Sequence, residues 1–257
     1  QQMFQQLGDQ RGEIDARLKY LNLANLTGQT EDLEARAQEA LRMAEQISYT
    51  AGIAKAKTLL AFIIADTTGE IETALQYNLA SVALWREVQD PFQLASALNN
   101  LGADLVEVHE FAAAEQALLE SRDLYQSLGY QRGVATAIHN LGETALRKGD
   151  AVRARELLCQ ALRIRHHLGL PRGYPYSYEL LAQVNEREGR YEQAVQLLAA
   201  AETLRKRIGA PLDPMAQQPV TAVLAGARAR LGEVGFELQW AKGAVMTIEQ
   251  AIALALS

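Results

Sequence analysis

The chain has 257 residues, of which 49% are hydrophobic, 22% charged and only 6% aromatic. This composition excludes a disordered chain, and the scarcity of aromatic residues and proline favours helices over strands. The net charge of −6 argues against a nucleic-acid-binding segment, which usually carries a clustered positive surplus. A single cysteine, Cys159, excludes an internal disulfide and fits a reducing cytoplasm.

The first residues, from Gln1 to Gln6, show neither the basic segment nor the apolar stretch of a signal peptide. No apolar run approaches the roughly 20 residues that span a bilayer. We therefore predict a cytoplasmic protein with no membrane contact. The absence of an initiator methionine indicates a fragment of a longer protein.

A pattern with a period of 40 residues runs along the chain. The segment 97–102 recurs as 137–142, and the segments 177–182 and 56–61 keep nearly the same frame. We predict a single solenoid over 1–257, with four well-matched repeats over 51–210. The segment 10–50 is an atypical first repeat, because Tyr20 stands where a glycine or alanine is expected; a register shift is the alternative. The segment 211–257 forms C-terminal capping helices.

Each repeat is expected to form two packed helices of roughly 16–18 residues. Leu98, Leu101 and Leu105 are spaced as one apolar stripe of a first helix. Gly102 would let the second helix approach closely, with Leu118 as the bulky residue opposite. His109 takes a turn position that is glycine in three other repeats, which predicts that it is exposed.

The tail carries its own signals. Thr247 and Gln250 are spaced as a capping box that opens a last short helix. Phe236 and Trp240, four residues apart, would form an apolar cap over the end of the stack.

The repeat resembles the tetratricopeptide repeat. The resemblance rests on Leu-Gly, an alanine twelve residues on, a large apolar residue four later and a small residue after three more, as in Leu101-Gly102, Ala114, Leu118 and Ser121. It implies an all-α, right-handed superhelix of helix pairs. The departures are the period of 40 instead of about 34 and the missing terminal proline; both are similar to the longer-helix variant of bacterial regulators.

The tail also resembles the closing segment of the helical sensor region in large bacterial regulators of the STAND/LuxR type, such as maltotriose-activator-like proteins. The residues that carry this resemblance are Leu231-Gly232-Glu233, Phe236, Trp240-Ala241-Lys242-Gly243 and the segment from Met246 to Ile252. The resemblance implies that the parent protein carries an ATPase and an output domain.

No catalytic motif is present in the sequence. A phosphate-binding loop, H-E-x-x-H, C-x-x-C and G-x-S-x-G are all missing. We therefore predict no enzyme, no cofactor and no metal; His166 and His167 are adjacent and would point about 100° apart on a helix. Seven basic residues between Arg147 and Arg172 are read as a solvated outer face, with an anionic ligand or acidic partner as the alternative.

A ligand would lie in the concave groove, which the first helix of each pair lines in tetratricopeptide proteins. The candidate groove residues are Asn99, Asn100, His139, Asn140, Glu143, Tyr176, Glu179 and Gln183. Asparagine can pair with both the N–H and the C=O of an extended peptide. In peptide-binding relatives an asparagine before Leu-Gly has this part, which Asn100 and Asn140 match; hydrated side chains on an unused face are the alternative.

Two functions follow. The first is a non-catalytic regulatory domain of a bacterial signalling or transcriptional regulator, which binds a protein, a peptide or a small effector. The alternative is a scaffold or oligomerisation solenoid with no groove ligand. Both functions are compatible with a homo-oligomer.

Overall fold

A computed structural model describes residues 9–26, 32–212 and 214–257, and this part of the chain contains helices and no strand. The predicted all-α fold is therefore confirmed. The chain divides into two compact units, Gln1–Leu128 and Gly129–Ser257, and each is described by itself.

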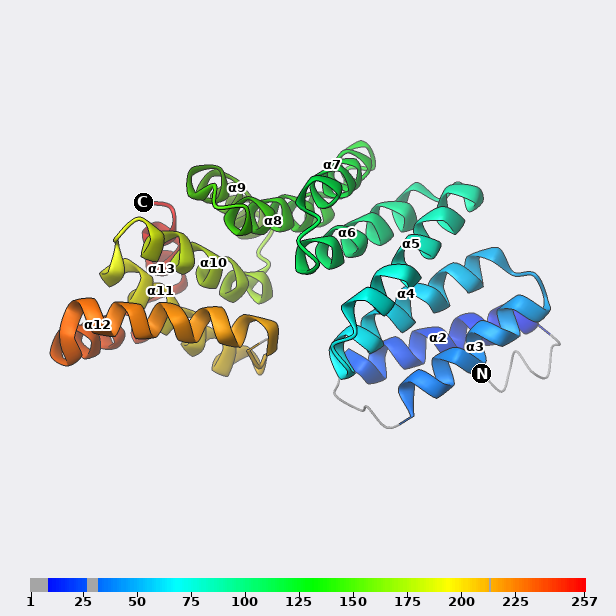
Figure 1. Ribbon diagram of the computed structural model, residues 1–257, viewed down its shortest axis with the longest axis horizontal. Helices are drawn as coiled ribbons and strands as arrows, with labels where there is room; N and C mark the ends of the chain where they lie inside the picture. Colours follow the sequence, from blue (N-terminus) through cyan, green and yellow to red (C-terminus); the bar gives the residue numbers. More distant parts are fainter. Residues whose placement is uncertain (1–8, 27–31, 213) are drawn as a thin grey trace. The chain divides into compact units, whose positions relative to one another are not determined.

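Residues 9–26 and 32–128, the described part of the first unit, form three helix pairs. They are α2 (Gln10–Leu26) with α3 (Leu33–Gln46), α4 (Thr50–Thr67) with α5 (Ile71–Val88), and α6 (Pro91–Glu107) with α7 (Phe111–Ser127). Consecutive helices pack against each other, and α2 also contacts α4, the first helix of the next pair (Figure 1).

The second unit continues the same plan. Its helices are α8 (Gln131–Arg147), α9 (Ala151–His167), the 3-10 turn η1 (Pro171–Gly173), α10 (Tyr174–Arg187), α11 (Tyr191–Ile208), α12 (Pro214–Ala244) and α13 (Ile248–Ala255). Gly232 interrupts α12 with a non-helical backbone at φ 69° and ψ 167°. First helices again meet, because α10 contacts both α8 and α12.

The turns within the helix pairs repeat one backbone conformation. Gly69, Gly149 and Gly189 lie in the left-handed region, at φ between 70° and 91°. His109 adopts φ 64° at the same position and is exposed, as predicted. Because glycine enters this region without steric cost, the recurring glycine marks each turn in the sequence.

The close approach of paired helices depends on small residues. A Cβ at Gly102 would lie 2.5 Å from Cγ of Leu118, and one at Gly142 would lie 2.8 Å from Cγ of Leu158. The predicted contact between Leu-Gly and the large residue of the second helix is thus present in both repeats.

The first helix pair is more regular than Tyr20 suggests. Tyr20 is exposed, whereas Ala37, Leu41 and Ala44 of α3 are buried with the spacing seen at Ala114, Leu118 and Ser121. The second helix of this pair therefore keeps the spacing of small and large residues found in the later repeats.

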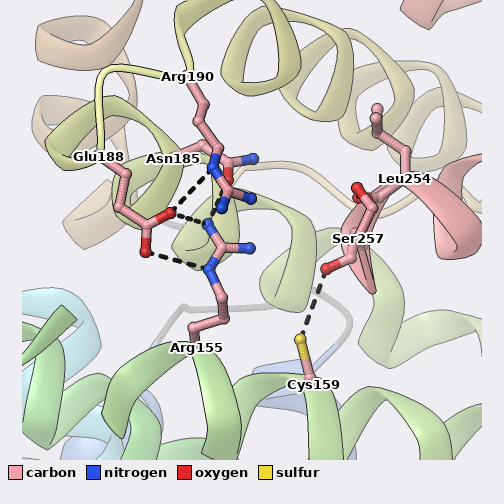
Figure 2. Close-up of polar contacts among 8 residues, drawn as sticks. Arg155, Cys159, Asn185, Glu188, Arg190, Leu254 and Ser257 are labelled. Carbon is pink, nitrogen blue, oxygen red and sulfur yellow. Dashed lines mark hydrogen bonds and ion pairs between the residues drawn. The ribbon is translucent and has the colours of Figure 1, made fainter. Parts of the chain in front are cut away.

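The predicted capping box is present at the start of α13. The Thr247 side chain accepts from the Gln250 N–H and the Gln250 side chain accepts from the Thr247 N–H, which is a complete capping box. The rings of Phe236 and Trp240 stack at 6.0 Å within an apolar cluster of α11 and α12. Cys159 is buried, and its thiol lies 3.5 Å from the Ala255 carbonyl oxygen, joining α9 to α13 (Figure 2).

A hydrogen bond between the buried Asn78 and the half-buried Asp104 affects the stability of the first unit. The Asn78 amide nitrogen donates to Asp104 Oδ2 at 2.6 Å, while the Asn78 carbonyl oxygen is buried without a partner among the described residues. Burial raises the pKa of Asp104 from 3.8 to about 6, against the lowering effect of this hydrogen bond. The folded state thus prefers the protonated acid.

We expect Asp104→Asn to stabilise the protein at neutral pH by ~2 kcal/mol, because the new amide carries no charge and can donate to Asn78. Because the pKa is raised on folding, the wild type should lose stability as the pH rises from about 4 to about 6. The variant should lack this loss. Urea midpoints at pH 4, 5, 6 and 7.5 test it, with the exposed Asp123→Asn as control; parallel profiles of wild type and Asp104→Asn would contradict it.

Candidate functional site

A cleft of about 550 Å³ lies within the first unit. The first helices of all three pairs, α2, α4 and α6, contribute its walls, and Trp85 of α5 adds to its floor. Ligand pockets in proteins commonly enclose about 300–1,000 Å³. The cleft therefore has the size of a binding site and lies on the helices that the repeat pattern assigns to the groove.

The inner surface of the cleft is apolar. Leu18, Leu59 and Trp85 line it from positions that are otherwise buried, and the Trp85 side chain is only 2% exposed. Phe62 lines the same cleft but is 46% exposed. An exposed phenylalanine beside a buried tryptophan provides an aromatic contact surface for an apolar group.

Polar side chains without partners surround this apolar surface. In the part of the chain that the structure describes, the side chains that line the cleft and form no hydrogen bond or ion pair are those of Lys19, Asn22, Gln93, Ser96 and Asn100. Together they offer amide donors and acceptors, one hydroxyl and one positive charge. Such a set can pair with both donors and acceptors of a ligand.

A fixed polar cluster borders the cleft. The Lys55 ammonium pairs with Asp15 at 2.9 Å, and the Tyr49 hydroxyl donates to the same carboxylate at 3.1 Å. Burial acts to lower the pKa of Lys55, but the hydrogen bond and charge of Asp15 outweigh it and raise that pKa. This cluster thus ties α4 to α2, and Lys55 stays charged.

Of the candidate groove residues, two belong to the first unit. Asn100 lines the cleft with an unpartnered side chain, whereas Asn99 is half-buried and is not among the lining residues. In the second unit, Asn140 and Gln183 are half-buried, and the half-buried Glu143 accepts from Arg147 at 3.1 Å within α8.

Glu179 and Tyr176 both contact Arg205, which forms a buried ion pair with Glu179. Arg205 of α11 donates from Nε and Nη2 to the two Glu179 oxygens at 2.7 and 2.9 Å, and both residues are buried. Its guanidinium also lies over the Tyr176 ring, 4.4 Å from the centroid. Glu179 is therefore occupied within the fold, while Tyr176 remains 39% exposed.

His139 is buried against a second arginine, Arg165 of α9. The Arg165 Nη1 lies 3.2 Å from His139 Nδ1 and also donates to Ser177 Oγ and to the Gly173 carbonyl oxygen. Burial and, less strongly, the Arg165 charge lower the pKa of His139 well below 6.5. His139 is thus a neutral acceptor.

The sequence interpretation missed these arginines. Arg165 was assigned to a solvated outer face, but it is buried. A signal was present, since the positions at 40-residue intervals are Trp85, Tyr125, Arg165 and Arg205. A column that begins with two aromatic residues indicates a packed position.

Another basic residue of this segment, Arg155, is half-buried and paired with residues distant in the sequence. Arg155 of α9 donates to Glu188 from Nε at 3.1 Å and from Nη2 at 2.7 Å, and it reaches the Asn185 side-chain oxygen (Figure 2). Arg190 adds a contact to Glu188 at 3.2 Å. The Arg155 contacts join α9 to the C-terminal end of α10.

No helix in the described ranges is long and apolar enough to cross a membrane.

The comparison with known families supports the repeat assignment. Residues 93–167 match the family model of the tetratricopeptide repeat. No curated protein has a significant match to the chain.

Solved structures of low sequence identity share the fold. A Rap protein complexed with competence and sporulation factor aligns with a TM-score of 0.63 and 14% identity, over 91% of this chain and 72% of that one. The Rap conjugation gene regulator of plasmid pLS20, in complex with the Phr* peptide, gives 0.59 and 13%, over 96% and 74%. BtubC from P. vanneervenii gives 0.59 and 22%, over 75% and 79%. These likenesses establish a tetratricopeptide-like fold.

Proposed function

We propose that the chain is a non-catalytic binding domain that holds a peptide segment in the cleft of the first unit. The observation that carries this proposal is the set of unpartnered polar side chains around an apolar floor. These side chains are exposed or half-buried and engaged with no other described part of the protein, so they are available to a ligand that also covers the apolar floor. An extended peptide offers N–H and C=O groups for Asn100, Asn22 and Gln93 and an apolar side chain for the floor.

The structural neighbours support a peptide as the class of ligand, since one Rap protein is in complex with competence and sporulation factor and the other with the Phr* peptide. We further infer that the domain serves a bacterial signalling or transcriptional regulator, with occupancy passed to an attached ATPase or output module. The support for this setting is the resemblance of the segment from Leu231 to Ile252 to the sensor regions of such regulators. The genomic reading frame around the chain tests it.

Trp85 makes the cleft measurable. The chain has two tryptophans, Trp85 in the cleft and Trp240 in α12, so Trp240→Phe leaves one fluorophore at the proposed site. A library of short synthetic peptides, selected on the immobilised protein, provides the probes. We expect selected peptides to shift the Trp85 emission saturably and with a stoichiometry of one.

Asn100→Ala should weaken this binding about five- to tenfold, the loss of one or two hydrogen bonds. Gln116→Ala, which removes an exposed amide of α7 outside the cleft, is the matched control and should leave the affinity unchanged. If no peptide changes the emission, or if both variants bind equally well, the cleft is not a peptide site and the scaffold alternative gains support.

A further inference from the structure

Two successive repeats of the second unit hold a buried arginine at the same position. Arg205 presents its Nε–Nη2 edge to the Glu179 carboxylate. Arg165 lies 40 residues earlier, and the residue 40 before Glu179 is His139. The sequence thus replaces the carboxylate of one repeat with an imidazole in the other.

The replacement leaves one edge of Arg165 unused. All its hydrogen bonds come from Nη1, which contacts His139, Ser177 and the Gly173 carbonyl oxygen at 2.8–3.2 Å. Nε and Nη2 have no acceptor, and no carboxylate forms an ion pair with Arg165, among the described residues. These are the two atoms with which Arg205 holds Glu179.

The charge of Arg165 is accordingly uncompensated. The residue is 8% exposed, and its neighbour His139 is neutral. Burial lowers the pKa of Arg165 only to about 10, so the guanidinium remains charged at neutral pH. Buried charges in folded proteins are normally paired, because an unpaired one has lost its hydration without replacement.

The Nε and Nη2 atoms of Arg165 keep some contact with solvent. The Arg165 nitrogens are not among the fully enclosed side-chain atoms that lack a partner. Gly173 packs closely against the Arg165 side chain, where an added Cβ would lie 2.8 Å from Cδ and 2.9 Å from Nε.

We propose that the Nε–Nη2 edge of Arg165 binds a carboxylate from another molecule, an acidic side chain of a peptide or protein, in the bidentate arrangement that Glu179 forms with Arg205. A guanidinium edge and a carboxylate match in geometry, and such paired hydrogen bonds are strong. The site lies wholly in the second unit. It stands independently of the cleft and can fail or succeed without it.

The experiment observes the Arg165 Nε–H directly by NMR of arginine-labelled protein, with the resonance assigned by its loss in Arg165→Lys. The probes are sodium acetate and the capped peptide acetyl-Gly-Glu-Gly-amide, compared with sodium chloride at equal ionic strength. We expect a saturable shift of Arg165 with acetate and with the peptide at lower concentration, and none with chloride. The Arg205 Nε–H, already paired, should not move.

His139→Glu supplies the missing carboxylate from within and should abolish the Arg165 shift, whereas the neutral control His139→Gln should keep it. A folded His139→Glu protein that still responds to acetate overturns the proposal, as does an Arg165 shift no larger than that of Arg205. If Arg165 responds to sodium phosphate but not to acetate, the ligand of this edge is not a carboxylate and the proposal is wrong. If the glutamate peptide binds more weakly than acetate, the carboxylate does not come from a peptide or protein side chain.

Discussion

Glu179→Ala is expected to cost about 3–5 kcal/mol of unfolding free energy, the largest loss from a polar substitution in the second unit. The variant would leave the buried Arg205 with the Pro211 carbonyl oxygen and the Tyr176 ring but no counter-charge. Urea unfolding followed by circular dichroism measures the loss. Most of this loss comes from leaving the Arg205 charge buried without a partner, and the lost attraction between Arg205 and Glu179 contributes less.

Two comparisons separate these contributions. Glu202→Ala removes an exposed pair with Lys206 on the same helix and should cost less than about 1 kcal/mol. The double variant Glu179→Met with Arg205→Met removes both charges and should recover most of the stability. Equal losses for Glu179→Ala and Glu202→Ala would show that the buried pair contributes no more than a surface one.

The sequence predicts the fold well because its signals are local and repeated. The geometry of a single repeat favours glycine in the left-handed turn and requires a small residue where the paired helices touch. Forty residues later the same geometry selects the same residues, as at Gly102 and Gly142. Even His109, the exception, is recognisable as a turn residue because its neighbours in the column are glycines.

The candidate sites are harder to predict because they depend on which side chains remain unpaired. Asn100 and Asn99 are adjacent and identical, yet only Asn100 lines the cleft. Glu179 and His139 share a column, but one is paired with its arginine while the other leaves an arginine edge free. Whether two side chains pair depends on the distance between them in the folded protein, and the 40-residue repeat pattern does not predict that distance.

Packing of α12 against α11 provides a second test with a large expected effect. Gly243 lies directly on the backbone of α11: a Cβ there would fall 2.7 Å from Gln196 Cα and 2.8 Å from its carbonyl carbon. A rotating side chain cannot relieve this overlap. The two helices are also joined by a hydrogen bond from Gln196 Nε2 to Gln239 Oε1 at 2.6 Å.

We therefore expect Gly243→Ala to cost about 3 kcal/mol, at the upper end for one added methyl group, because α12 must move away from α11. Gly226→Ala in the same helix is the matched control. Its Cβ would meet only Glu186 Oε1, at 3.3 Å and at the end of a flexible side chain. This variant should gain up to about 1 kcal/mol from helix propensity. Opposite shifts of the urea midpoint would establish that the backbone contact at Gly243 holds α12 on α11; equal shifts would show that α12 adjusts freely.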